Sequence, residues 1–140
     1  MAPHRVILCH FDSYSTALVF ACWPDRSLLW PGPLPEGAQP GEGAPDTSGP
    51  AVMAETVARL GLNADEIVHV PEFDACLTAP TGPLRVHLLR FTTFEAPAAL
   101  LAPHDAVFKP ISALRGYAPA ELLLLRQVFN LIIGGDSGRR

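Results

Sequence analysis

A segment rich in proline and glycine divides the chain and limits what it can fold into. Residues 31–50 read PGPLPEGAQPGEGAPDTSGP, and proline or glycine fills 11 of these 20 positions. Proline lacks the backbone N–H that helices and sheets need, and proline and glycine both interrupt regular secondary structure. We therefore expect neither helix nor strand to persist there. The 30 residues that precede the segment are too few to fold alone. They must pair with the chain that follows, so we expect residues 1–140 to form a single domain with a surface loop at 31–50.

Apolar patterning on both sides of this loop predicts the secondary structure. Short apolar runs rich in Val, Ile and Phe are typical of strands, and the first two runs are separated by a polar turn, which predicts a hairpin. Apolar residues at helical spacing that end at Gly61 predict the first helix, and Pro119 suits the start of the last one. The predicted strands are 5–11, 17–23, 28–30, 66–70, 72–77, 84–94 and 106–112, and the predicted helices are 51–60 and 119–133.

The order of these elements predicts the fold class. Strands, a long loop, a helix, more strands and a final helix favour a mixed sheet sandwiched between helices, in an α/β (α+β) fold. The helix at 119–133 carries apolar residues around too much of its circumference for one solvated face. It is therefore either covered on two sides within the chain or packed against a second subunit, which leaves a homodimer or a hetero-assembly open.

Composition and charge exclude several classes of protein. The net charge is −4, the only lysine is Lys109 and the arginines are scattered, so a basic patch for nucleic acid is not expected. No stretch approaches the roughly 18 apolar residues of a membrane span, and the first residues do not form a convincing signal peptide. We therefore expect a cytoplasmic protein. Cys9, Cys22 and Cys76 are odd in number and irregularly spaced, which favours buried free thiols.

The helix at 51–60 and its surroundings resemble a known enzyme family. The stretch AVMAETVARLGL at 51–62 is similar to the end of the Nudix hydrolase signature, G-x5-E-x7-R-E-U-x-E-E-x-G-U, where U is a bulky apolar residue. With the final glycine of the signature on Gly61, its first helix glutamate falls on Glu55 and its loop glutamate on Asp46. The stretch WPGPLPEG at 30–37 resembles the W-x-x-P-G-G-like segment of many members. The resemblance covers roughly residues 5–133 and implies a Nudix-like α/β/α sandwich.

The departures from that signature bear on the chemistry. In the family, glutamates on one helix face hold Mg²⁺ or Mn²⁺ against the diphosphate of the substrate, because hard cations need oxygen ligands. Here the equivalent face offers one carboxylate and one guanidinium, which predicts an ion pair between Glu55 and Arg59. The signature arginine falls on Ala54, its apolar position on Thr56, its adjacent glutamate pair on Ala58 and Arg59, and its leading glycine on Pro40. The resemblance therefore implies a degenerate, pseudoenzyme-like signature in which metal-dependent hydrolysis has been lost.

Two classes of function follow. The first is a module that binds a small molecule or a protein partner without a cofactor, in a site between the sheet, the 31–50 loop and the helix. Arg59 would contact an anionic ligand in place of a metal ion. The expected lining of this site is Trp30, Glu55, Arg59, Glu72 and Asp74.

The second class is an active, divergent hydrolase of nucleoside-diphosphate-linked compounds that uses relocated carboxylates. Asp46 and Glu55 would then be the candidate ligands of Mg²⁺ or Mn²⁺, and no catalytic residue is assigned. A structural subunit of a larger assembly is a third reading. A zinc site formed by His69, His87 and Cys76 is conceivable if their strands are neighbours, although their spacing does not demand it.

Overall fold

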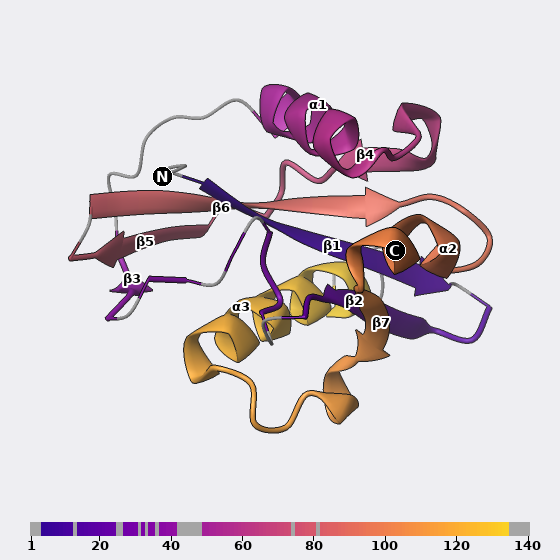
Figure 1. Ribbon diagram of the computed structural model, residues 1–140. Coiled ribbons are helices and arrows are strands. Elements are labelled where there is room, and N and C mark those ends of the chain that lie inside the picture. Colours follow the sequence, from indigo (N-terminus) through magenta and orange to yellow (C-terminus); the bar gives the residue numbers. More distant parts are fainter. Residues whose placement is uncertain are drawn as a thin grey trace.

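The chain forms one mixed β-sheet with helices on both sides (Figure 1). The computed structural model describes residues 4–12, 14–24, 27–30, 32, 34–35, 37–41, 49–73, 75–80 and 82–134. The strands are β1 His4–Asp12, β2 Ala17–Cys22, β3 Gln39–Pro40, β4 Ile67–His69, β5 Ala75–Ala79, β6 Gly82–Phe91 and β7 Val107–Pro110. The helices are α1 Gly49–Leu60, α2 Ala98–Leu101 and α3 Pro119–Phe129. The expected α+β class is confirmed, and none of the described helices is long and apolar enough to cross a membrane.

A parallel pair of long strands forms the centre of the sheet. The strand order is β3-β5-β6-β1-β2-β7, and β4 also pairs with β6. β1 runs parallel to β6 from His4 opposite Arg85 to His10 opposite Phe91. All the other strand pairs are antiparallel, including the predicted hairpin of β1 and β2. The first strand of the chain is therefore joined in the sheet to a strand that begins some 70 residues after it ends.

Each face of the sheet is buried under a different helix. Side chains alternate between the two faces along a strand, so Val6 and Leu8 of β1 pack with α1, whereas Ile7 and Cys9 pack with α3. A strand covered on both sides needs apolar residues at every position, which explains the continuous run in β1. The thiol of Cys9 lies deep in the α3 layer, and this burial raises its pKa to about 12.

The first helix forms where its apolar spacing predicted. Val52, Thr56 and Leu60 recur every fourth residue and are buried against the sheet. The Thr56 hydroxyl donates to the Val52 carbonyl at 2.8 Å, so the one polar group in this row is satisfied within the helix. Gly61 follows with a φ of 71°, the left-handed conformation in which helices commonly end.

The closing helix is covered by the sheet on one side. Leu124, Leu125 and Val128 are buried in the same chain, which accounts for much of its broad apolar surface. Leu123 and Phe129 are exposed. A subunit interface through this helix stays a prediction.

Two sequence expectations around the proline- and glycine-rich segment are wrong. Residues 28–30 do not form a third strand, because only Trp30 pairs, in an isolated bridge with Val6. Conversely, the segment contains the short strand β3, which pairs with β5. That pairing brings the backbone of Gly41 against Thr78, where any side chain at position 41 would overlap the threonine hydroxyl.

A buried carboxylate fixes the chain that leads to Trp30. Glu121, in the first turn of α3, is only 2% exposed. Its two oxygens accept hydrogen bonds from the backbone N–H groups of Leu28 at 2.9 Å and Leu34 at 3.4 Å. An acidic residue is also favoured at this end of a helix by the helix dipole. Glu121 therefore ties the segment around Trp30 to the α3 layer.

Removal of this carboxylate is expected to destabilise the fold. Glu121→Ala leaves two inward-facing N–H groups without their acceptor, which costs about 2–4 kcal/mol of unfolding free energy. Urea unfolding followed by circular dichroism measures the change. Glu95→Ala, at an exposed position, is the control and should change stability by less than about 0.5 kcal/mol. Equal midpoints for Glu121→Ala and the unaltered protein would contradict this role.

Candidate functional site

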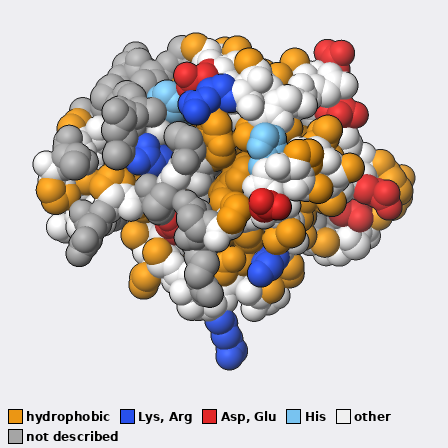
Figure 2. All heavy atoms as spheres, in the orientation of Figure 1, with side chains coloured by type: hydrophobic (Ala, Val, Ile, Leu, Met, Phe, Trp, Pro, Cys, Tyr) orange, Lys and Arg blue, Asp and Glu red, His pale blue; other side chains and the backbone are white. Residues whose placement is uncertain are grey.

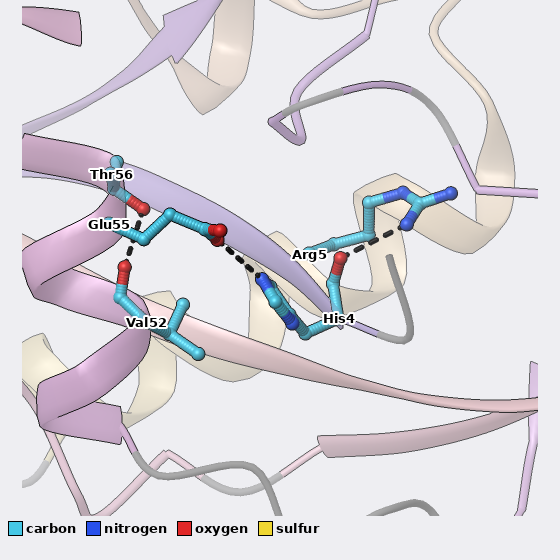
Figure 3. Close-up of polar contacts among 5 residues, drawn as sticks. All are labelled: His4, Arg5, Val52, Glu55 and Thr56. Carbon is cyan, nitrogen blue, oxygen red and sulfur yellow. Dashed lines mark hydrogen bonds and ion pairs between the residues drawn. The ribbon is translucent and has the colours of Figure 1, made fainter. Parts of the chain in front are cut away.

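Helix α1 places Glu55 over the beginning of β1. The Nε2–H of His4 donates to Oε1 of Glu55 at 3.2 Å, as Figure 3 shows. The next residue, Arg5, directs its guanidinium away from Glu55 and donates from Nη1 to the His4 carbonyl at 3.0 Å. The carboxylate that the Nudix resemblance aligns with a metal ligand is therefore engaged by a histidine of the sheet.

The predicted ion pair between Glu55 and Arg59 is wrong. Glu55 reaches to β1, and the Cζ atom of Arg59 lies 4.8 Å from the centre of the Trp30 ring. A pair four residues apart on an exposed helix face contributes only about 0.2–0.5 kcal/mol, so contacts with groups already fixed by the sheet readily override it. Trp30 is fixed in this way, because its N–H and C=O both hydrogen-bond to Val6.

The contact between Arg59 and Trp30 joins two residues that the sequence predicted to share a site. A guanidinium within about 6 Å of an aromatic ring centre is attracted to the electron-rich face of that ring. The contact holds the guanidinium of an exposed side chain in a defined place at the surface of α1. Glu55 lies one helical turn earlier.

Three histidines lie side by side on the face of the sheet that α1 covers. The ring centres of His4 and His87 are 6.4 Å apart, and those of His87 and His69 are 5.7 Å apart. The imidazole of His69 also lies directly against Gly49, where a Cβ atom would overlap the ring. The sequence suggested that His69 and His87 are neighbours, but it gave no reason to add His4, since that depends on the parallel register of β1 and β6.

No metal centre is formed by the described part of the chain. Within it, no group of three or more His, Cys, Asp or Glu side chains is arranged to hold a metal ion. The conceived zinc site of His69, His87 and Cys76 is therefore not formed. Cys76 pairs across the sheet with Arg85, two residues along β6 from His87, whereas His69 pairs with Leu89 on the other side of His87.

Of the remaining acidic candidates, the structure describes only Glu72. Glu72 is exposed and acts electrostatically on His69, where its charge opposes the lowering of the histidine pKa by burial. Asp46 and Asp74, the other predicted acidic residues, lie outside the described residues. Of the five residues expected to line a pocket, the structure thus brings Trp30 and Arg59 into contact and leaves Glu72 beside the histidines.

Comparison with known proteins adds no family to this picture. No family model matches the chain, and no curated protein is significantly similar to it. The resemblance to Nudix hydrolases therefore stays a prediction that rests on the residues named above.

The pH dependence of stability should report on His69. Burial lowers its pKa from the ordinary value of about 6.5, and the charge of Glu72 opposes this only in part. His87 and the backbone of Gly49 also face the ring. A histidine whose pKa is lower in the folded state than in the unfolded state binds a proton less readily when folded. Its contribution to stability is fully present above the pKa of the unfolded state, and it is lost as the pH falls through the pKa of the folded state.

We therefore expect the thermal midpoint to fall on acidification below about pH 6.5, and to fall less in His69→Gln. The measurement is thermal unfolding of both proteins in buffers from about pH 8 to about pH 5. The difference between the two curves reports on the imidazole of His69 and on the groups that face it. Parallel curves would show that its protonation is not linked to folding.

Proposed function

We propose that this chain is a ligand-binding domain on a Nudix-like scaffold that has lost metal-dependent diphosphate hydrolysis. A mixed sheet between helices and a helix that follows a proline- and glycine-rich loop support the scaffold. The observation that carries the proposal is the guanidinium of Arg59, held 4.8 Å from the centre of the Trp30 ring. At the position of Arg59 the family signature has a glutamate.

The replacement of a glutamate by Arg59 changes the side-chain charge at this position from negative to positive, and so changes how the site can bind a phosphate. A glutamate there would bind a divalent cation, and the cation would bind the phosphate. An arginine offers a planar set of N–H donors that binds a phosphate or carboxylate directly. None of the described residues accepts a hydrogen bond from the Arg59 guanidinium, so its donors can serve a ligand.

The loss of hydrolysis follows from the shortage of oxygen ligands on the same helix face. Glu55 is hydrogen-bonded to His4, and position 58 is an alanine. A single engaged carboxylate beside a fixed positive charge is a poor place for Mg²⁺, which requires several oxygen ligands in near-octahedral geometry. The expected ligand is therefore a small phosphate-bearing molecule bound without a metal ion.

Thermal unfolding in the presence of ligands tests this proposal. ADP, a sugar nucleotide and a dinucleoside polyphosphate are added in turn, each with EDTA or with Mg²⁺ and Mn²⁺. A ligand at about 100 times its dissociation constant adds about 2.7 kcal/mol, which raises the midpoint of a domain of this size by several degrees. We expect at least one compound to do so in EDTA.

Two variants locate the effect. Arg59→Ala should abolish the metal-independent shift, whereas Arg126→Ala, which removes an exposed arginine from α3 on the other face, should retain it. A shift that requires the metal, with hydrolysis of the compound, would contradict the proposal and support the divergent hydrolase. The absence of a shift with every compound would contradict phosphate binding at Arg59.

A further inference from the structure

A separate pocket lies at the carboxyl ends of the parallel strands β1 and β6. Its volume is about 360 Å³, within the range of small-molecule sites. Its lining includes Phe11 and Asp12 of β1, Tyr14, Val68 of β4, Arg90 of β6, and Thr92, Thr93 and Phe94 of the segment that follows β6. None of these residues belongs to the site around Arg59, which lies on α1.

Exposed apolar side chains converge on this pocket. Tyr14 is 85% exposed, Phe94 75% and Val68 45%. In the described part of the chain only six large hydrophobic side chains are exposed, and these three all line the same pocket. In Figure 2, hydrophobic and acidic side chains meet at the right-hand edge of the molecule, the end at which β6 leaves the sheet in Figure 1. Exposed apolar side chains that gather in one patch are typical of an interaction site, whereas singly scattered ones are normal.

The two aromatic rings are held in place although they are exposed. The rings of Tyr14 and Phe94 meet edge to face with their centres 5.9 Å apart. The carboxylate of Asp12 accepts hydrogen bonds from the backbone of Tyr14 at 2.9 Å and of Ser15 at 3.4 Å. Thr16 follows with a φ of 56°, a conformation that is strained for a β-branched residue. The hairpin thus keeps an unfavourable backbone in the turn that presents Tyr14.

The loop that carries Phe94 is fixed from the sheet. The Nε2–H of buried His10 donates to the Thr93 carbonyl at 2.7 Å. The hydroxyl of Thr93 in turn donates to the carbonyl of Glu95 at 2.6 Å. A ring held in this way loses little conformational freedom when a ligand packs against it.

Arg90 supplies a positive charge in the lining of the pocket. Its Cζ atom lies 5.5 Å from the centre of the Phe11 ring, which orients the guanidinium. Among the described residues, none forms an ion pair or a hydrogen bond with this guanidinium, and Arg90 lines the pocket. In the same wall, Oδ1 of Asp12 accepts the hydrogen bonds of the hairpin backbone, which lower the pKa of this carboxyl group, Tyr14 acting most strongly.

We propose that this pocket binds a small planar aromatic molecule that bears an anionic group. The ring of the ligand packs against Tyr14 and Phe94, and its carboxylate or equivalent group pairs with Arg90. The exposed rings of Tyr14 and Phe94 in its wall suit a flat aromatic ring. This proposal does not depend on ligand binding at Arg59.

The test uses 1-naphthoate as the probe and nuclear magnetic resonance of backbone amides as the readout. Naphthoate should shift amides confined to residues 11–16, 67–69 and 90–95. It should bind more tightly than 1-naphthamide, which has the ring without the charge, and than cyclohexanecarboxylate, which has the charge without a flat ring. Arg90→Gln and Phe94→Ala should each weaken naphthoate at least about tenfold.

Control variants distinguish this pocket from the site around Arg59. Arg126→Gln and Arg59→Ala should bind naphthoate as the unaltered protein does, and unchanged amide positions elsewhere will show that the Arg90 and Phe94 variants are folded. Equal affinity for naphthoate and naphthamide, or unchanged affinity in Arg90→Gln, would overturn the proposal. Shifts centred on α1 that vanish in Arg59→Ala would assign the probe to the Arg59 site and overturn it as well.

Discussion

The parallel pairing of β1 with β6 is the constraint on which the rest of the structure depends. It joins residues at the start of the chain to residues 85–91, with α1 and the four strands β2, β3, β4 and β5 between them in the sequence. The entropic cost of closing so long a loop must be offset by burial, and both faces of β1 are accordingly apolar. Once this pair has formed, α1 and α3 have opposite faces to cover.

The same pair positions both candidate sites, one at each end. At the amino end of the pair, His4 lies on the side of the sheet that α1 covers. There it hydrogen-bonds to Glu55 of α1, and its ring lies beside that of His87 on the adjacent strand. At its carboxyl end the chain leaves the sheet in two loops, which carry Tyr14 and Phe94. The first site presents Arg59 on the surface of a helix, and the second presents Arg90 within a pocket. Both arginines are oriented by an aromatic ring.

Local patterns in the sequence were sufficient for most of the elements. The apolar spacing that ends at Gly61 predicted the first helix, and the run at 72–77 predicted a strand that overlaps β5, Ala75–Ala79. Contacts between distant segments were not predictable in this way. The pairing of Glu55 with His4 overrode a local ion pair because His4 is brought under α1 by a strand register that no local pattern encodes. The second site also depends on a contact between distant segments. Tyr14 and Phe94 are 80 residues apart in the sequence and meet only because β1 is aligned with β6.

The central claim is that the scaffold offers a fixed positive charge where a metal ion would be expected. Titration of the protein with Mn²⁺, followed by the electron paramagnetic resonance signal of the free ion, tests this claim most directly. The account predicts that the free-ion signal rises in proportion to added Mn²⁺, as it does in buffer, and that Glu55→Ala behaves identically. A saturable loss of signal with one ion bound per chain, abolished by Glu55→Ala, would contradict it and would restore Glu55 as a metal ligand.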